Sequence, residues 1–405
     1  MLFHFFDRFL AEYESRFEKQ YGFLRPIIKD VVERYLDCGN PRCGFARIRC
    51  PDCHAEHLLM FSCRTRGFCP SCHAKRLEEW GEWMREALLL DVPHRQVVFT
   101  IPRMLRIFFK YNRKLLGSLC RLALRSLIHY FAAVTGSELV PGVIAAIQTF
   151  GDRINFHPHL HFLVTEGGVD EAGIFHKIPR IDDARLAELF AREVVGFLVH
   201  KELLSPDWAD RLLSWRHTGF NVHSRVRAKT KKEAERVGKY MIRPLLSLER
   251  LSLDERSGQV GYRYGKEAQV ERMDYLEFIA RVTSHIPEKG QVTVRYYGLY
   301  ANAHRGKVKK ASRVPVSQGL MEEELRPIPS KGWAEMIRKV YEVDPLVCPK
   351  CGGQMKIISF LTDWDVVDRI IDHLKLTFVA ERPPPAHLTY QEVLMAAEPS
   401  GEYFS

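Results

Sequence analysis

The chain has 405 residues, of which 46% are hydrophobic and 27% charged, an ordinary globular composition that suits two or three domains of roughly 100 to 200 residues each. No run of eighteen apolar residues occurs, which argues against a membrane-spanning helix, and charged residues interrupt the apolar start, which argues against a secretory signal. The formal net charge of +10 favours a polyanionic partner, either nucleic acid or an anionic membrane. We therefore expect a cytoplasmic protein that begins with an amphipathic helix.

Seven of the ten cysteines lie between Cys38 and Cys72. Without a secretory signal, such a cluster is more typical of metal binding than of disulfides. Two Cys-x-x-Cys knuckles separated by fifteen residues have the spacing of a zinc ribbon, in which four thiolates bind one tetrahedral Zn2+. The sequence therefore predicts a structural zinc site formed by Cys50, Cys53, Cys69 and Cys72.

Three cysteines of this segment are left over, with three histidines nearby. They either complete a second zinc site or are buried without a metal, and the surrounding arginines and lysines suit contact with phosphates. The leftover cysteines are Cys38, Cys43 and Cys63, and the histidines are His54, His57 and His73.

Beyond the cysteines, the apolar spacing of residues 74–90 predicts a helix that leads into a second domain. Residues 94–101 have the character of a β-strand, and residues 106–134 contain no proline and fit one or two helices. Residues 142–150 and 159–168 flank a polar turn and predict a β-hairpin. This order indicates an α+β domain with a mostly antiparallel sheet and flanking helices.

Three histidines, His157, His159 and His161, stand where the second strand of this hairpin begins. His159 and His161 are two positions apart, so their side chains share one face of a strand. A turn centred near Ile154 brings Gln148 close to this pair, because opposed residues of a hairpin lie about 4.5–5.5 Å apart between Cβ atoms. Two imidazoles, one amide oxygen and open positions suit a divalent cation that also binds substrate oxygens. The sequence thus predicts a metal site at His159, His161 and Gln148, and hydrogen-bonded structural histidines are the alternative.

A strongly basic segment, residues 224–250, contains nine lysines and arginines against three glutamates. A helix is predicted from about Lys231, with Pro244 ending it. Tyr240 lies beside the buried stripe of this helix, and Arg236 and Arg243 share its face. Nearby positive charge favours a nucleophilic phenolate and binds the phosphate that it attacks. The alternative is a tyrosine at the edge of an amphipathic helix with a solvated basic face.

These features together resemble the HUH endonucleases, a group of relaxases and rolling-circle initiators, and most closely the rolling-circle transposases of the insertion sequence 91 family. The resemblance spans about Cys38 to Asp363 and implies that His159 and His161 bind a metal and that Tyr240 is the nucleophile. It is carried by the stretches "RCPDCHAEHLLMFSCRTRGFCPSC", "QTFGDRINFHPHLHFLV", "WRHTGFNVHSRVRA", "GKYMIRPLLSLERL", "VRYYGLYANAHRGK" and "DPLVCPKCGGQMKIISFLTD".

One departure from the family concerns the tyrosines. Many members carry two tyrosines four residues apart, but here position 236 is arginine and position 244 is proline. The chain therefore resembles the single-tyrosine branch. Tyr296, Tyr297 and Tyr300 are candidates for a second tyrosine, although a strand followed by a basic loop also explains them.

The resemblance implies a transposase that nicks and rejoins single-stranded DNA at element ends through a 5'-phosphotyrosine. It needs catalytic Mg2+ or Mn2+ and structural Zn2+, and no nucleotide cofactor, since no phosphate-binding Gly-x4-Gly-Lys-Ser/Thr loop occurs. We expect a bacterial, nucleoid-associated protein with single-stranded or melted DNA as its partner and no membrane. Residues 303–313 and five side chains are expected to contact this DNA, namely Arg225, Arg227, Arg236, Lys239 and Arg243.

The predicted organisation is a zinc-binding domain at residues 1–90, an HUH domain at 91–265, a DNA-interacting region at 266–380 and a tail at 381–405 that lacks a sustained pattern. Cys348 and Cys351 form half of a zinc site, completed by His373 or a leftover N-terminal cysteine, or else they form a simple turn. Two functional alternatives are a plasmid-type rolling-circle replication initiator and a nonenzymatic zinc-ribbon DNA-binding protein.

Overall fold

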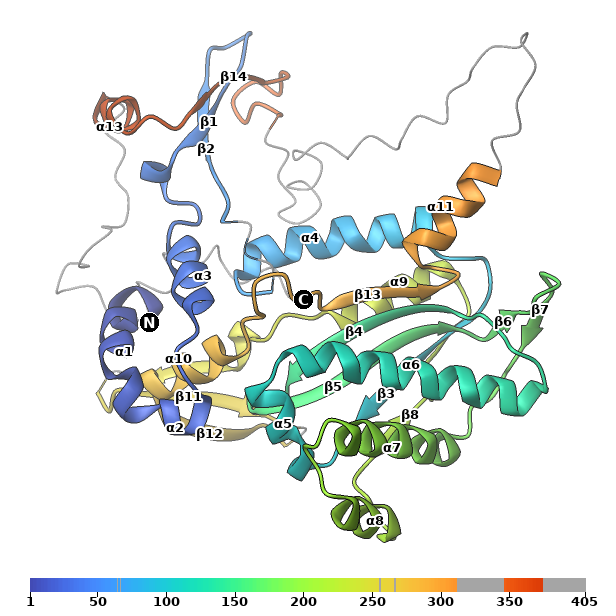
Figure 1. Ribbon diagram of the computed structural model, residues 1–405. Helices are drawn as coiled ribbons and strands as arrows, with labels where there is room; N and C mark the ends of the chain where they lie inside the picture. The colour runs from blue at the N-terminus through green and yellow to red at the C-terminus, as the bar shows by residue number, and fades with distance from the viewer. Residues whose placement is uncertain (64, 66, 255, 266, 312–345, 374–405) are drawn as a thin grey trace, which may run out of the picture.

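The computed structural model describes residues 1–63, 65, 67–254, 256–265, 267–311 and 346–373. Within them, no helix is both long and apolar enough to cross a membrane. Figure 1 shows a large central sheet with helices packed around it and a small sheet that stands apart from it at the top of the view.

The central sheet is antiparallel and six-stranded, in the order β13-β4-β5-β3-β8, with β9 also paired to β3. The predicted hairpin forms its middle, and its turn contains Ile154 with a positive φ of 57°. The strands are β3 (His94–Thr100), β4 (Gly142–Phe150), β5 (Phe156–Thr165), β8 (Asn221–His223), β9 (Arg227–Ala228) and β13 (Val294–Gly298).

The two faces of this sheet bury different side chains. Leu160, Phe162 and Val164 of β5 point into the main hydrophobic core, whereas Leu163 points into a second core on the other face. Successive residues of a strand alternate between faces, so His159 and His161 share the face of Leu163. The histidines are therefore on the face opposite the main core.

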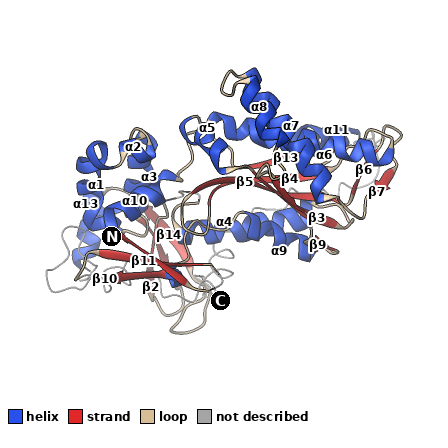
Figure 2. Cartoon of the chain, turned by 90° about the horizontal axis from the view of Figure 1, so that it is seen from below, coloured by secondary structure: helices blue, strands red, loops and turns tan. Residues whose placement is uncertain are grey.

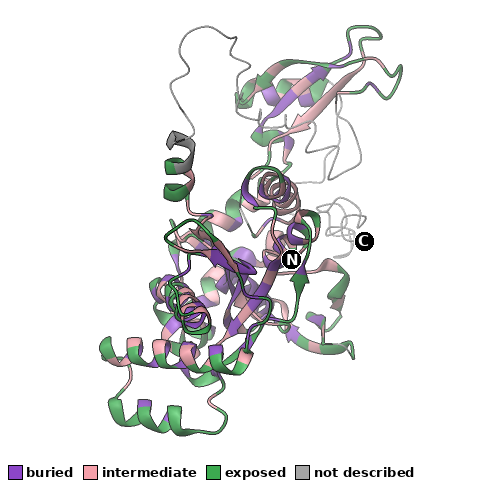
Figure 3. Ribbon diagram, turned by 90° about the vertical axis from the view of Figure 1, so that its right-hand side faces the viewer, coloured by how far each residue is buried: buried purple, intermediate pink, exposed green. Residues whose placement is uncertain are grey.

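Helices enclose the sheet on both sides (Figure 2). The main core packs against α6 (Lys114–Thr135) and α7 (Asp183–His200), and the second core packs against α4 (Pro70–Trp83) and α9 (Lys231–Met241). Helices α6, α7 and α9 are buried on one side and exposed on the other, whereas most residues of α4 are of intermediate burial (Figure 3). The further elements of this region are η2 (Met84–Leu88), η3 (Arg103–Leu105), α5 (Arg106–Tyr111), β6 (Gly167–Val169), β7 (Phe175–Lys177), α8 (Pro206–Ser214) and α11 (Asn302–Ala311).

A third core joins the N-terminal helices to a segment far along the chain. Phe9 and Val32 pack with Val260 and Leu276, and this core crosses the predicted domain boundary at residue 265. Its elements are α1 (Leu2–Arg16), α2 (Glu18–Tyr21), α3 (Pro26–Leu36), η4 (Leu248–Arg250), β10 (Leu251–Asp254), β11 (Gln259–Tyr264), β12 (Gln269–Asp274) and α10 (Tyr275–Ser284).

The small sheet at the top of Figure 1 combines an early segment of the chain with one far along it. Its order is β14-β1-β2, and both pairings are antiparallel. Phe45 of its central strand packs against Val367 and Ile371 of the helix that follows β14. The elements are η1 (Pro41–Cys43), β1 (Phe45–Arg49), β2 (Glu56–Met60), β14 (Lys356–Leu361) and α13 (Trp364–His373).

These observations confirm the predicted α+β class with mostly antiparallel sheets. One local expectation is wrong: the described part of the basic stretch at 303–313 is not a loop but part of helix α11. Lysine, arginine and alanine have good helix propensity, so the stretch forms a helix despite its single glycine. Residues 312–313 and the predicted tail at 381–405 lie outside the described residues.

Candidate active site

The two candidate metal-ligating histidines lie on β5, the middle strand of the central sheet. Their rings are neighbours, with centroids 4.9 Å apart. On β4, Gln148 is the direct cross-strand partner of His159, as predicted from the position of the turn, and Ala146 is the partner of His161. The hairpin therefore brings His159, His161 and Gln148 together on one face of the sheet.

Hydrogen bonds orient both imidazole rings through Nδ1. His159 Nδ1 lies 2.7 Å from the carbonyl oxygen of His157, and since a carbonyl only accepts, Nδ1 carries the proton and Nε2 keeps the lone pair. His161 Nδ1 lies 3.1 Å from the side-chain amide of Gln96 on β3. The Gln96 atom that faces the ring is Nε2, which only donates, so Nδ1 of His161 accepts this hydrogen bond, and only with the Gln96 amide turned over would Nε2 of His161 keep a lone pair for a metal. A backbone carbonyl that accepts from the other ring nitrogen, as at His159, is a usual support of a metal-ligating histidine.

Burial keeps these rings neutral. Loss of solvent lowers the pKa of His161 to about 3 and also lowers the pKa of His159, and the positive charge of Arg243 acts in the same direction on both. A metal ligand must be an unprotonated imidazole. The environment thus favours the form of both histidines that binds a cation.

Gln148 supplies an acceptor that lacks a partner. Its Nε2 donates to the carbonyl oxygen of Met241 at 2.6 Å, while its buried Oε1 has no hydrogen-bond partner among the described residues. A buried amide oxygen without a partner costs roughly 1–3 kcal/mol. A divalent cation held with the two imidazoles would satisfy this oxygen, so the residues present fit a metal of the kind that takes nitrogen and oxygen ligands.

Tyr240 lies on α9, which crosses this face of the sheet. Thr230 caps the helix by accepting a hydrogen bond from the backbone of Glu233, and the helix ends at Met241. The Tyr240 ring centroid is 6.5 Å from that of His161, and 53% of the residue is exposed. Because Gln148 binds the backbone of the next residue, Met241, the candidate metal ligand also holds the end of the helix that carries the candidate nucleophile.

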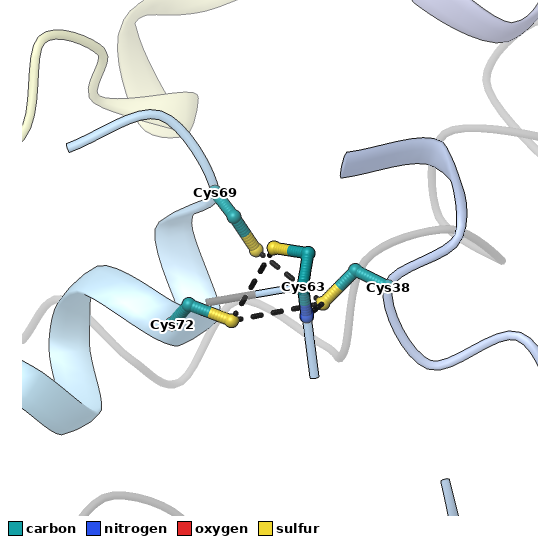
Figure 4. A group of neighbouring side chains, drawn as sticks. All are labelled: Cys38, Cys63, Cys69 and Cys72. Atoms are coloured by element: carbon teal, nitrogen blue, oxygen red, sulfur yellow. Dashed lines mark hydrogen bonds between the residues drawn. The ribbon is translucent and has the colours of Figure 1, made fainter. Parts of the chain in front are cut away.

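A separate group of four cysteines lies between the N-terminal helices and α4. Cys38 Sγ is 3.7 Å from Cys72 Sγ and 3.6 Å from Cys69 Sγ, and Cys63 Sγ is 3.5 Å from Cys72 Sγ (Figure 4). Four sulfurs about 2.3 Å from a tetrahedral Zn2+ lie about 3.8 Å from one another. These four cysteines therefore form a fitting zinc site, which we call the first cysteine cluster.

Both groups of residues lie in regions of the chain that match known protein families. Residues 6–101 match the family model of a transposase zinc-binding domain, and residues 142–308 match that of a putative transposase. The chain is 30% identical, over 82% of its length and 84% of the relative's, to the transposase of insertion sequence element IS801 from Pseudomonas savastanoi pv. phaseolicola. The chain belongs to the insertion sequence 91 family of transposases. It is also 28% identical, over 72% of its length and 79% of the relative's, to the putative transposase y4qJ of Sinorhizobium fredii, and no solved structure matches it.

Family membership favours a transposase over the two functional alternatives, a plasmid-type replication initiator and a nonenzymatic DNA-binding protein. It also bears on the zinc-binding domain, in which the predicted grouping of the cysteines needs correction. Cys69 and Cys72 are in the first cysteine cluster of this transposase, but Cys50 and Cys53 lie in another group, with Cys348 and Cys351. Spacing alone misled the prediction, because each knuckle supplies only two thiolates and the fold determines which pairs meet.

The fold also shows where the three leftover cysteines and the three histidines of the cysteine-rich segment lie. Cys38 and Cys63 complete the first cysteine cluster, while Cys43 is exposed and outside both groups. None of the three nearby histidines belongs to either group. The two predicted partners for Cys348 and Cys351, His373 or a leftover N-terminal cysteine, are both wrong, because Cys50 and Cys53 complete this group.

The tyrosines proposed as second actors in this transposase have other contacts. The Tyr296 hydroxyl accepts a hydrogen bond from Trp80 Nε1 at 2.6 Å, and the Tyr297 hydroxyl lies 3.6 Å from Cys120 Sγ. Tyr300 is buried, with its hydroxyl 2.5 Å from His94 Nε2. Of the tyrosines considered for the reaction, Tyr240 alone is next to the paired histidines.

The five side chains predicted to bind DNA differ in how they are engaged within the transposase. Lys239 forms ion pairs with Glu78 at 2.7 Å and Glu235 at 2.9 Å, and Arg227 pairs at 2.7 Å with the buried Glu166. The charges of these two side chains are therefore already paired within the protein. Arg225 and Arg236 are exposed, and Arg243 covers the Tyr240 ring at 5.2 Å with Asp152 3.8 Å away.

Sequence reasoning missed a basic cleft beside the histidines. It has a volume of about 960 Å³ and is lined by His157 and Asp152, the latter contacting Arg243. Arg106 reaches into it with a buried Nε that has no hydrogen-bond partner among the described residues, and burial, followed by the charge of Arg103, lowers the Arg106 pKa. The other charged and aromatic residues that line it are Tyr21, Arg103, Lys110, Tyr111, Arg153, Phe156, Tyr264, Glu271 and Arg281.

A sequence signal for this cleft existed. Arg103, Arg106 and Lys110 are spaced to share one side of the helical stretch of η3 and α5, and such spacing indicates a basic helix face. The remaining walls come from α2, the β4–β5 turn, β11, β12 and α10, and nothing in the sequence indicates that these segments meet.

Proposed function

We propose that this transposase nicks and rejoins single-stranded DNA at the ends of its element, with Tyr240 as the nucleophile and a 5'-phosphotyrosine as the intermediate. The observation that carries the proposal is the placement of an exposed tyrosine, 6.5 Å between its ring centroid and that of His161, beside a pair of neutral histidines, of which His161 is buried and His159 half-buried. The orphaned oxygen of Gln148 supports a cation at the same point.

The chain's own residues have separable roles in this reaction. His159, His161 and Gln148 would hold Mg2+ or Mn2+, which when bound supplies charge stabilisation to the scissile phosphate. The Tyr240 oxygen forms a bond to phosphorus as the bond to the 3'-oxygen breaks, so the phenol loses its proton and the DNA gains a free 3'-hydroxyl. Attack of a 3'-hydroxyl on the phosphotyrosine reverses these events, and no nucleotide cofactor is needed because one phosphoester replaces another.

The basic cleft supports the preference for single strands. It offers cations for phosphates and the rings of Tyr21, Tyr111 and Tyr264 for bases, the combination typical of surfaces that bind single-stranded nucleic acid. In a duplex the bases are stacked on one another and would not reach these rings. We infer that DNA next to the scissile phosphate passes through this cleft.

Covalent trapping tests the proposal. Tyr240→Phe should abolish the protein–DNA adduct formed with a labelled single-stranded oligonucleotide that carries an element end, while binding measured by fluorescence anisotropy changes little, because only the nucleophilic oxygen is lost. Tyr296→Phe is the matched control and should keep full adduct yield. A normal adduct yield from Tyr240→Phe would show that another residue is the nucleophile.

A further inference from the structure

A second group of four cysteines joins segments from the two ends of the chain. Cys50 Sγ is 3.5 Å from Cys351 Sγ, and Cys53 Sγ is 3.5 Å from Cys348 Sγ, although the partners are 301 and 295 positions apart. A disulfide would place its sulfurs about 2.05 Å apart, whereas thiolates around a tetrahedral Zn2+ lie about 3.8 Å apart. The spacing is that of metal ligands.

The N-terminal half of this group is a tight turn between β1 and β2. The His54 N–H donates to the Cys50 carbonyl at 3.1 Å, and the Cys50 N–H donates to the Ala55 carbonyl at 2.8 Å. His54 adopts a left-handed conformation, with φ of 60°, which is uncommon for a residue other than glycine. This turn directs the thiols of Cys50 and Cys53 to one side.

The C-terminal half repeats the same turn. The Gly352 N–H donates to the Cys348 carbonyl at 2.8 Å, and the Cys348 N–H donates to the Gly353 carbonyl at 2.9 Å, at the same offsets as in the first turn. Gly352 is left-handed as well, with φ of 73°. A Cβ on Gly353 would meet the carboxylate of Asp52, so the first turn lies directly against the second. Two equivalent turns therefore face each other with two thiols each.

The pairing of β1 with β14 and the contact of Phe45 with Val367 and Ile371 hold this part of the chain together, but the core around the thiols is small. The buried residues around the four thiols are Ile48, Cys50, Cys348 and Met355, and half of these are cysteines. A core of this size buries too little apolar surface to offset the loss of chain entropy, and small domains of this kind are usually stabilised by a metal or by disulfides. None of the ten cysteines, all of which lie in the described residues, is in a disulfide.

We propose that Cys50, Cys53, Cys348 and Cys351 bind a second Zn2+, which closes a module built from both ends of the chain. This site extends beyond the matched zinc-binding domain, which ends at residue 101. Soft thiolates in a tetrahedral arrangement select zinc among the common divalent metals. The metal fastens β14 to β1 and so attaches the C-terminal segment to the N-terminal domain.

Metal analysis of the full-length protein tests the stoichiometry. The unmodified chain should contain two zinc ions, Cys351→Ala should contain one, and Cys43→Ser should contain two because Cys43 lies outside both groups. Cys351→His should restore the second ion, since imidazole also binds zinc. Two zinc ions in Cys351→Ala, or one in the unmodified chain, would overturn the proposal.

Hydrogen exchange tests whether the site joins the two ends. Cys351→Ala should increase exchange in peptides that contain β1 as well as in those that contain β14. Cys50→Ala should likewise increase exchange in peptides that contain β14 as well as in those that contain β1. Peptides of β5 and α9 serve as the internal control and should not change. Loss of protection confined to the substituted turn in both variants would show that the cysteines form independent turns, which contradicts a shared metal.

Discussion

At the scale of single residues, the paired histidines are defined by what binds their Nδ1 atoms. His159 is fixed by a backbone carbonyl, whereas His161 depends on the side chain of Gln96. The two rings are therefore not equivalent. A change at Gln96 would reach the candidate metal through His161 alone.

The first residue-scale prediction concerns the metal ligands. The double variant His159→Ala/His161→Ala should lower the rate of single-strand cleavage by about 10³-fold or more, as expected when stabilisation of the charge on the phosphate is lost. Gln148→Ala should have a smaller effect, because water can replace one oxygen ligand. Cleavage across a Mn2+ titration measures both. Thermal melts provide the control: the central sheet should remain folded because Leu160, Phe162 and Val164 form its core, and an active double variant would exclude the metal site.

A second prediction concerns the cleft. Arg106→Gln should weaken binding of single-stranded DNA by roughly tenfold to a hundredfold, since a hydrogen bond to a charged group contributes about 1.5–3 kcal/mol. The loss should be smaller for an oligonucleotide that stops at the scissile phosphate. Arg121→Gln, on the exposed side of α6, is the matched control. Equal affinities for the Arg106 and Arg121 variants in anisotropy titrations would place the DNA elsewhere.

At the scale of elements, the junction between α10 and the β4–β5 hairpin contains a buried histidine. His285 Nδ1 lies 3.0 Å from Thr149 Oγ1, and its Nε2 lies 3.0 Å from the carbonyl oxygen of Ile154. Burial lowers the pKa of His285 to about 3, and the charges of Arg113, Arg25 and Lys110 act in the same direction. The junction is therefore built around a neutral imidazole.

This junction predicts a pH dependence of stability. In the unfolded chain a histidine has a pKa of about 6.5, so below this pH the unfolded state binds a proton that the folded state does not, and folding becomes less favourable. For one such group the free energy of unfolding should fall by about 1 kcal/mol per pH unit between roughly pH 6 and 4. Denaturant titrations at several pH values give the free energy of unfolding, and its slope against pH should be shallower for His285→Gln than for the unmodified chain. Identical slopes would assign the acid sensitivity to other groups.

The sequence predicted individual elements better than it predicted which of them contact one another in the fold. The hairpin, the helix of Tyr240 and the placement of Gln148 opposite His159 follow from local alternation and from one turn. The partners of Cys50 do not, because Cys348 and Cys351 satisfy the same spacing rule as Cys69 and Cys72 and only the tertiary fold distinguishes them. The cleft was unpredictable for the same reason, since its walls come from several separate segments.

At the scale of the whole molecule, zinc is expected to stabilise the cysteine-rich part of the protein and not the central sheet. The first cysteine cluster holds β2, α3 and α4 near one another, whereas the central sheet has a large apolar core of its own. Cys69→Ser should lower the zinc content and increase proteolysis within residues 38–72, because much of the folding energy of such modules is metal-binding energy. Cys43→Ser is the control. Unchanged zinc content in Cys69→Ser would exclude the first cluster as a zinc site.

The proposed second zinc site also affects when the protein can be completed during synthesis. Cys50 leaves the ribosome long before Cys351, which follows it by 301 positions. Contacts of such high sequence separation form late, because the intervening chain must be ordered first. A nascent chain therefore carries β1 and β2 with two unpaired thiols while the central sheet is already folding. Truncated translation products, which lack Cys348 and Cys351, would never close this module, so its closure distinguishes full-length transposase from fragments.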